Sequence, residues 1–488
     1  MTDKVTLGKL ATGVPGLDLL LGGGLNEFSF NLITGAPGCG KTTMAHQIMF
    51  ALAKPERRAL FFTVLGEPPL KMLRYQQQYS FFDVDKVGSA IRYVNLANDL
   101  RAGDFNGVLE RITEEVENFA PSLVFVDSFR SVIQTGRGGV EGASDLQYFV
   151  QELGTRMTSW MATTFLIGEY QHNDAEANPI MTVADGMIAM SQQLERNAVV
   201  RKIRVIKMRG QAHLSGTHTL RITADGLRIY PRMLPPLAAE RLPGRPVDTA
   251  IQRIPTGTLG LDEMLHGGLP EGHSILAIGP TGCGKTILGT RFLQAGVARG
   301  ERGVLLSFEK GTARLRNQAM ETMIQGGQVT VVETRSLDIT VEEIEDELST
   351  AIQRSGASRV VIDSLSEFGL YLAPECRNDQ REAIFRMLSS LAKLGVSVVV
   401  TSGLEDHALN MNHARADIAY LTDSMVAMRY AEADGQIRRF ISVVKVRGSA
   451  HSNDVREYRI TDEGLEIDAL PAAVNGVMFG GTDSALPE

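Results

Sequence analysis

Two copies of one short glycine-rich stretch decide the fold. Gly35-Ala-Pro-Gly-Cys-Gly-Lys-Thr42 returns as Gly279-Pro-Thr-Gly-Cys-Gly-Lys-Thr286, and both match the phosphate-loop pattern G-x-x-x-x-G-K-[ST]. Each copy follows an apolar, strand-length run, residues 30–34 or 275–278, and precedes a helical segment. In this context the glycines let the amide N–H groups turn inward and bind phosphate at the helix N-terminus. The sequence therefore predicts two nucleotide-binding sites.

Each loop also supplies the side chains that a nucleotide and its metal need. We expect Lys41 and Lys285 to reach the β- and γ-phosphates, and the hydroxyls of Thr42 and Thr286 to bind Mg²⁺. The expected cofactors are ATP and Mg²⁺. The expected loop residues that bind them are Gly38, Cys39, Gly40, Lys41, Thr42 and Thr43 in the first copy, and Gly282, Cys283, Gly284, Lys285, Thr286 and Ile287 in the second.

The cysteine inside each loop, Cys39 or Cys283, allows two interpretations. Either any small residue fits there, or the loop amides and the neighbouring lysine lower the pKa of the thiol and make the site sensitive to oxidation. With Cys376 these are the only cysteines among 488 residues. So few thiols indicate a reducing compartment and not a disulfide-stabilised fold.

The similarity between the two copies extends beyond the loops. Residues 12–42 match residues 256–286 without a gap at 17 of 31 positions, and Lys207-Met-Arg-Gly210 returns as Lys445-Val-Arg-Gly448. Matches that keep their order along the chain indicate a tandem repeat. We therefore expect one domain at 1–237, a proline-rich linker at 238–249, a second domain at 250–469, and a flexible C-terminal tail at 470–488.

Short buried runs alternate with helix-patterned stretches inside each copy, which predicts an α/β fold with a mainly parallel sheet flanked by helices. The expected helices include residues 108–118 and 381–394. The expected strands include residues 60–64, 123–126 and 164–167 in the first copy, and 304–308, 360–362 and 396–400 in the second.

Carboxylates follow the expected strands where a metal would bind. Asp127 and Asp363 each end an apolar strand, and the carboxyl edge of a parallel sheet is where ligands bind. We expect both to hold the Mg²⁺ shell through water; the alternative is a turn or helix cap. The candidates for the base that orients water are Glu67 and Glu309, and Glu309 is also an expected metal residue. Leu65 is the ungapped counterpart of Glu309, so Glu67 can serve as the base only if the first copy is shifted by two residues. The alternative is that Glu67 is a surface glutamate with no catalytic role.

Paired cations follow a β-rich segment in each copy, as Lys207 and Arg209 and as Lys445 and Arg447. Alternation along a strand would point both cations of a pair to one face. Such a pair is often merely solvated. The sharper interpretation is a catalytic finger that stabilises the γ-phosphate bound to a neighbouring subunit.

Composition limits the possible functions. The net charge is −8, the pI is near 5.7, and one tryptophan and nine histidines give no basic–aromatic pattern for DNA, so we expect no nucleic-acid partner. The N-terminus lacks the apolar core of a signal peptide and the longest apolar runs are strand-length. We expect a cytoplasmic protein without a membrane partner.

Together these residues resemble the KaiC family, the two-domain RecA-type ATPases of the cyanobacterial circadian clock and their relatives. The resemblance covers nearly the whole chain, including both phosphate loops, both aspartates and Lys-x-Arg-Gly followed by His213 or His451. It implies tandem RecA-like domains in a double-ring homohexamer, with ATP at subunit interfaces also contacted by His213, Ser449 and His451. It further implies slow hydrolysis in the first ring, autokinase and autophosphatase activity in the second, and a KaiB-like protein partner.

The chain departs from the clock proteins at positions that matter for phosphorylation. Where the clock proteins carry paired glutamates, the first copy reads Leu65-Gly66-Glu67 and the second Glu309-Lys310, and their adjacent Ser-Thr pair falls on Ala419-Tyr420. Three functions therefore stay open. The first is an ATP-hydrolysing signalling hexamer whose nucleotide state a partner reads. The second is a serine/threonine autokinase that uses the second-domain ATP. The third, against which the acidic composition argues, is a RecA-type DNA-repair ATPase.

Overall fold

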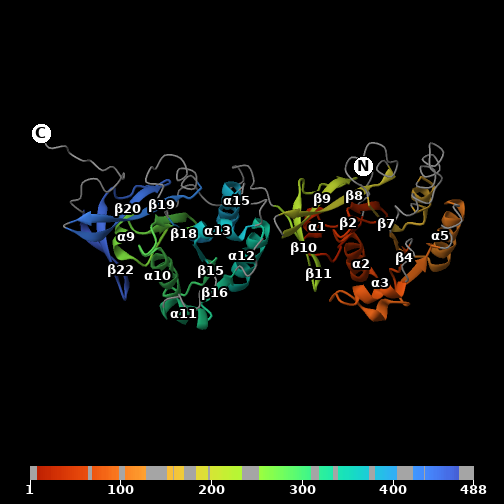
Figure 1. Cartoon of the computed structure of the whole chain (residues 1–488), viewed down its shortest axis with the longest axis horizontal. Coiled ribbons are helices and arrows are strands. Elements are labelled where there is room, and N and C mark those ends of the chain that lie inside the picture. The colour runs from red at the N-terminus through yellow and green to blue at the C-terminus, as the bar shows by residue number, and fades with distance from the viewer. Residues whose placement is uncertain are drawn as a thin grey trace, which may run out of the picture. The chain divides into compact units, whose positions relative to one another are not determined.

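The chain folds as two compact units, Met1–Arg232 and Met233–Glu488, in a computed structural model (Figure 1). The structure describes residues 8–63, 69–97, 105–127, 151–157, 159–169, 183–195, 198–232, 252–308, 318–333, 339–372, 380–403, 421–433 and 435–471. The expected linker at 238–249 lies outside these residues. Strand β22 (Gly464–Pro471) extends two residues into the segment expected to form the tail, because Pro471 pairs with Arg456 of the neighbouring strand.

The first unit is built on a nine-stranded sheet in the order β11-β10-β9-β8-β3-β7-β6-β4-β5. Pairing is parallel from β8 through β3, β7, β6 and β4 to β5, and antiparallel from β8 through β9 and β10 to β11. The strands are β3 (Phe30–Gly35), β4 (Ala59–Thr63), β5 (Ile91–Asn95), β6 (Leu123–Asp127), β7 (Thr163–Gly168), β8 (Gly186–Glu195), β9 (Ala198–Met208), β10 (His218–Thr223) and β11 (Gly226–Tyr230).

The second unit repeats this topology in the order β16-β15-β17-β18-β14-β19-β20-β21-β22. Its parallel part ends at β19, and the pairs from β19 to β22 are antiparallel. The strands are β14 (Ser274–Gly279), β15 (Gly303–Ser307), β16 (Val329–Glu333), β17 (Arg359–Asp363), β18 (Ser397–Gly403), β19 (Ser424–Ala433), β20 (Gln436–Val446), β21 (Val455–Thr461) and β22. The predicted fold, tandem mainly parallel sheets flanked by helices, is confirmed.

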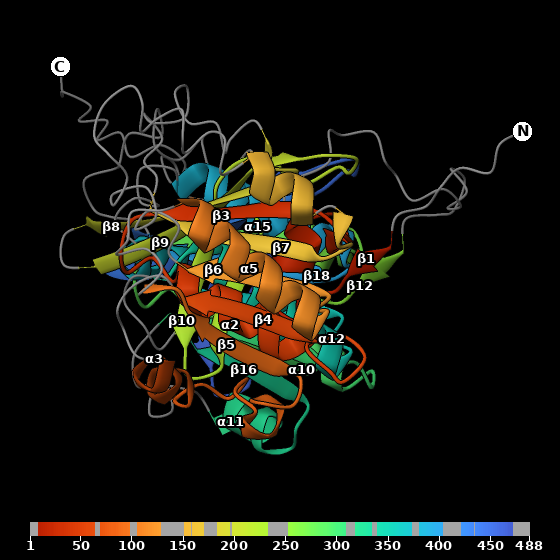
Figure 2. The ribbon, with the colours of Figure 1, turned by 90° about the vertical axis from the view of Figure 1, so that its right-hand side faces the viewer.

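Helices cover both faces of each sheet because residues along a strand point alternately to the two faces. In the first unit, Phe61 packs with helix α2 (Lys41–Leu52), whereas its neighbours Leu60 and Phe62 pack with α5 (Phe105–Phe119). Figure 2 shows α5 lying across strands β6 and β4. In the second unit α10 (Lys285–Val297) packs on one face, and α12 (Val341–Ser355) and α15 (Gln380–Lys393) pack on the other.

Short elements complete both units. Each unit opens with a two-stranded antiparallel ribbon, β1 with β2 in the first and β12 with β13 in the second. Among the described residues no helix is long and apolar enough to cross a membrane. The remaining elements are α1 (Leu17–Leu20), α3 (Pro69–Gln76), η1 (Val84–Lys86), α9 (Leu259–Met264), α11 (Gln318–Gln325), α13 (Leu365–Tyr371), β1 (Lys9–Leu10), β2 (Leu25–Asn26), β12 (Arg253–Ile254) and β13 (Leu269–Pro270).

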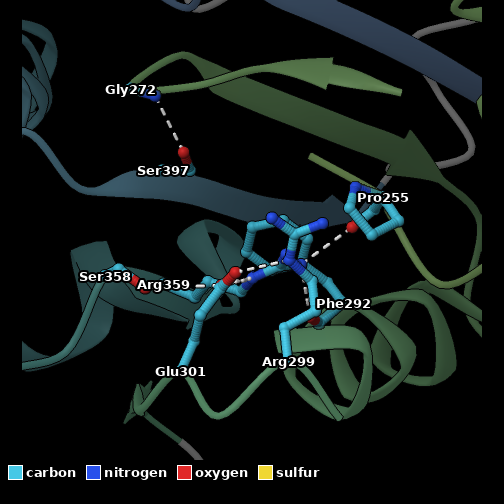
Figure 3. Close-up of polar contacts among 8 residues, drawn as sticks. All are labelled: Pro255, Gly272, Phe292, Arg299, Glu301, Ser358, Arg359 and Ser397. Atoms are coloured by element: carbon cyan, nitrogen blue, oxygen red, sulfur yellow. Dashed lines mark hydrogen bonds and ion pairs between the residues drawn. The ribbon is translucent and has the colours of Figure 1, made fainter. Parts of the chain in front are cut away.

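A buried arginine joins three segments of the second unit (Figure 3). Arg359 begins β17, and its side chain is only 1% exposed. Its Nε donates to Glu301 at 2.6 Å, and its Nη1 donates to the carbonyls of Pro255 at 2.8 Å and Phe292 at 2.9 Å. The guanidinium also lies 4.6 Å from the centre of the Phe292 ring. By strand register the first unit has Leu123 at this position, so the contact belongs to the second copy alone.

Candidate nucleotide-binding sites

Each phosphate loop lies at the carboxyl end of the central parallel strand, β3 or β14, and leads into α2 or α10. Gly40 and Gly284 precede these helices with φ of 102° and 98°, which only glycine adopts readily. A Cβ atom on Gly40 would also lie 2.8 Å from the side chain of Ile222. The glycines therefore permit a loop tight enough for backbone amides to surround a phosphate.

The loop lysines lie inside the curve of their own loops. Lys41 Nζ donates to the carbonyls of Gly35 and Ala36, both at 2.9 Å. Lys285 Nζ makes the equivalent contacts at 2.8 Å with Gly279 and Pro280. Residues 36–38 of the first loop and residues 281–282 of the second are exposed to solvent, so a phosphate can approach each loop from outside. The lysine ammonium groups inside these loops fit the phosphates of a nucleoside triphosphate.

The first copy brings the two expected metal side chains together. Thr42 Oγ1 donates to Asp127 Oδ2 at 2.6 Å across a separation of 85 residues. Thr42 is the second residue of α2 and Asp127 ends β6, so the parallel topology brings the two side chains together. A hydroxyl and a carboxylate on one edge fit the oxygen ligands that Mg²⁺ prefers.

The second copy engages its aspartate differently. The Thr401 hydroxyl donates to Asp363 Oδ1, and Thr401 lies on the neighbouring strand β18. Thr286 occupies the helical position equivalent to Thr42. In the first unit the residue paired with Asp127 on the neighbouring strand is Ile167, which has no hydroxyl. Sequence reasoning missed Thr401, because its partner lies 38 residues away and only sheet order brings the two together.

The loop thiols are poorly suited to a redox role. Cys39 and Cys283 have no exposed surface, and their sulfurs lie 4.0 Å and 3.8 Å from the lysine Nζ of the same loop. Burial raises the pKa of both thiols and outweighs the opposing effect of the lysines. Because thiolate is the reactive form, the structure favours the interpretation that a small buried residue fits here.

The finger cations lie at the amino ends of the parallel strands, whereas the phosphate loops lie at the carboxyl ends. Lys207 is the last but one residue of β9 and Arg209 directly follows the strand, where Met208 pairs with Gly186 at the start of β8. Arg209 Nη1 lies 3.2 Å from Asp185 Oδ1, and burial and the neighbouring Arg209 lower the pKa of Lys207.

The second copy places its pair at the same edge. Lys445 Nζ donates to the carbonyl of Thr422 at 2.6 Å, and Arg447 Nη1 lies 3.9 Å from Asp423 Oδ1. As in the first copy, burial and the adjacent arginine lower the pKa of the lysine.

The residues that follow the fingers stay on this edge. His451 Nδ1 is 2.9 Å from the carbonyl of Ser452, and the Ser449 hydroxyl contacts the guanidinium of Arg253. In the first copy, Leu214 directly after His213 donates its N–H to the carbonyl of Leu20. The expected nucleotide-binding residues therefore form two groups, one at each edge of the sheet.

The antiparallel strands contribute loop contacts that sequence reasoning missed. In the second copy Tyr430 OH donates to Thr281 O at 3.4 Å, and Tyr458 OH donates to Cys283 O at 2.5 Å. In the first copy Arg201 Nε donates to Gly38 O at 3.4 Å, and its counterpart Arg439 lies over the ring of Tyr430. The repeat offset that relates the finger motifs also relates Arg201 to Arg439, so an internal alignment could have found this pair.

Several predicted residues lie outside the part of the chain that the structure describes. They are the candidate bases Glu67 and Glu309, the neighbouring Lys310, and the positions Ala419 and Tyr420.

Known proteins are similar to both units of the chain. The family model for the KaiC ATPase matches residues 10–233 and 254–472. The circadian clock protein KaiC3 of Synechocystis is 29% identical over 505 residues, which cover 98% of this chain and 96% of that protein. The circadian clock oscillator protein KaiC of Rippkaea orientalis is 27% identical over 493 residues, which cover 96% of this chain and 90% of that protein.

Proposed function

The chain belongs to the KaiC family of ATPases, and from this premise we propose that it is an ATP-driven signalling hexamer. ATP and Mg²⁺ bind at both phosphate loops, and each subunit completes the site of its neighbour with a Lys-x-Arg finger. A partner protein, KaiB-like by analogy with the clock proteins, reads the nucleotide state of the first ring.

The position of the fingers is the observation that supports this proposal most. Strand β3 begins at Phe30 beside Asp185, which contacts Arg209, and ends at Gly35 in the phosphate loop. At about 3.3 Å per residue the two edges are about 16 Å apart. The finger therefore serves a loop on another subunit. A closed ring of identical subunits joins one such edge to the opposite edge of the next subunit.

The chain's own residues divide the work at each site. The loop amides and Lys41 or Lys285 hold the phosphates, and Thr42 with Asp127, or Thr286 with Asp363, would hold the metal shell. Bound Mg²⁺ offsets charge on the β- and γ-phosphates. Glu67 and Glu309 remain the proposed water-orienting bases. Arg209 and Arg447 add positive charge where the γ-phosphate develops negative charge.

Single-copy variants test the proposal. Lys41→Ala should abolish nucleotide binding in the first copy and weaken assembly, whereas Lys285→Ala should leave a hexamer with fewer nucleotides. In the Lys285→Ala background, Arg209→Ala should lower kcat about 10²-fold while ATP still binds. An unchanged kcat would exclude the finger role. Single-stranded DNA added to the same assay should leave the ATPase rate unaltered. A marked increase in that rate would favour the hypothesis of a DNA-repair ATPase.

The structure argues against the alternative of a serine/threonine autokinase. Ala419-Tyr420 stands where the clock proteins carry their Ser-Thr pair, and the nearest hydroxyls on the sheet side are Thr422 and Ser424. Both are fully buried, and neither hydroxyl has a hydrogen-bond partner among the described residues. Thr422 and Ser424 could meet a γ-phosphate in line only if the local strand shifted, and about 1 Å of misplacement already costs about 10²-fold in rate.

We therefore expect no autophosphorylation at these positions. The intact mass of the chain should be unchanged after hours with ATP and Mg²⁺. A phosphate mapped by peptide sequencing to Tyr420, Thr422 or Ser424 would contradict this prediction.

A further inference from the structure

The finger arginine of each copy contacts an aspartate at the start of the adjacent strand. Arg209 reaches Asp185 Oδ1 at 3.2 Å and also donates its backbone N–H to the Asp185 carbonyl at 2.9 Å. Arg447 repeats both contacts with Asp423, at 3.9 Å and 2.9 Å. We infer that Asp185 and Asp423 are positioning residues that orient the fingers toward the neighbouring subunit's phosphate. This inference rests on the proposed function.

The second oxygen of each aspartate is fixed by the strand that carries the phosphate loop. Asp185 Oδ2 accepts from the N–H of Phe30 at 3.0 Å, while the Asp185 N–H donates to the Phe30 carbonyl at 2.7 Å. Asp423 Oδ2 accepts from the N–H of Ser274 at 2.9 Å and from its hydroxyl at 2.8 Å. One oxygen thus anchors the carboxylate, and the other faces the arginine.

A finger needs such an anchor because its side chain is long and mostly in solvent. Arg209 is 58% exposed and Arg447 is 56% exposed. An arginine whose side chain moves freely loses rotamer entropy when it meets a phosphate. An arginine that is already oriented loses less, so more of the interaction energy reaches the transition state.

The ion pair is weak enough to yield to a phosphate. Exposed ion pairs of this kind contribute little stability, whereas the γ-phosphate carries more negative charge than one carboxylate and develops charge during the reaction. The aspartate therefore guides the finger without locking it. Because the Asp423 pair is longer and Ser274 donates twice to its anchored oxygen, we expect the weaker guidance in the second copy.

An asparagine substitution removes the charge that faces the arginine but keeps the hydrogen bonds that hold the side chain to the neighbouring strand. Asp185→Asn retains an oxygen for the Phe30 N–H and the backbone contacts but removes the charge that faces Arg209. In full-length chain carrying Lys285→Ala, this variant should lower kcat about 3- to 10-fold and leave the KM for ATP within about 2-fold. Asp225→Asn is the matched control and should change neither kcat nor KM. Asp225 is an exposed aspartate on the turn between β10 and β11, and it accepts a hydrogen bond from the Ser80 hydroxyl.

A double-mutant cycle decides the outcome. Asp185→Asn should have no further effect on kcat once Arg209→Ala is present, because the aspartate acts only through the arginine. If Arg209→Ala alone leaves kcat unchanged, the finger role fails and this inference fails with it. Two other outcomes would keep the finger role but overturn the positioning role. In the first, Arg209→Ala lowers kcat and Asp185→Asn does not. In the second, Asp185→Asn lowers kcat by the same factor in chains with Arg209 and in chains with Arg209→Ala.

Discussion

His46 lies on the phosphate-loop helix α2 with no exposed surface. Its Nδ1 is 2.8 Å from the carbonyl of Thr42, and its ring lies 4.4 Å from that of Phe61. Burial lowers the pKa of His46 to about 4, and the contact with Thr42 opposes this shift only in part. The second copy has Thr290 at this position, whose hydroxyl donates to the Thr286 carbonyl at 3.0 Å. The first copy therefore has a titratable group at this position that the second copy lacks.

We predict that the first unit loses stability as the pH falls from about 6.5 to about 4. The unfolded chain takes up the His46 proton near pH 6.5, whereas the folded chain takes it up only near pH 4. Stability from this group is therefore full above pH 6.5 and falls by about 3 kcal/mol by pH 4, at about 1.4 kcal/mol per pH unit. Urea unfolding over this pH range measures the loss.

His46→Thr is the matched control for this prediction, because Thr290 already makes the equivalent contact. The variant should remove the pH dependence that His46 contributes. The same pH slope in the variant and the parent chain would assign the effect to other groups.

At the residue scale, motif residues were predictable and their partners were not. The loop residues and the terminal aspartates could be predicted because each motif is contiguous or ends a recognisable apolar run. Thr401, Tyr458 and Asp185 carry no local signal, because their partners lie 38, 175 and 155 residues away. Only the order of strands in the sheet makes these pairs neighbours.

Among the elements, β17 and the loop before β15 are joined by the ion pair between Arg359 and Glu301 at 2.6 Å. Burial would raise the pKa of Glu301, but the hydrogen bonds and charges of Arg359 and Arg299 outweigh it and hold the pKa below its usual value. Stability from Glu301 is therefore present above its ordinary pKa of 4.5 and is lost as the pH falls through the lower folded value.

We predict that Glu301→Ala destabilises the second unit by about 3 kcal/mol, because it leaves the Arg359 charge buried without its partner. Arg299→Ala removes the other, 47% exposed partner of Glu301 and should cost less than about 1 kcal/mol. Denaturant unfolding compares the two variants. Equal losses would show that burial of Arg359 does not determine the effect.

At the element scale, the parallel strands could be predicted better than the antiparallel ones. Runs such as residues 123–126 and 164–167 are apolar on both faces, and β6 and β7 form there. Residues 199–206 and 439–444 read only as β-rich, since strand β20 alternates irregularly between exposed and buried positions. Their pairing as antiparallel extensions depends on sheet partners that local patterns do not identify.

For the whole molecule, we predict a hexamer whose stability depends on ATP. A phosphate held between one subunit's loop and its neighbour's Arg209 or Arg447 links the two chains, and a ligand that binds only the assembled form stabilises it. Size-exclusion chromatography with light scattering should show the hexamer with ATP and Mg²⁺ and smaller species after nucleotide removal. An equally stable hexamer without nucleotide would contradict the bridging role.

The central claim is that a finger on one subunit serves a site on the next, and mixing two inactive variants tests it most directly. Both variants carry Lys285→Ala, so only first-copy sites count. Asp127→Asn keeps Arg209 but impairs the metal site, and Arg209→Ala keeps the site but lacks the finger. Native mass spectrometry first establishes that mixed rings form. Random mixing should then place an intact site beside an intact finger at about one quarter of interfaces and restore ATPase activity to that extent. A mixed-ring rate equal to the mean of the two separate variants would contradict the account.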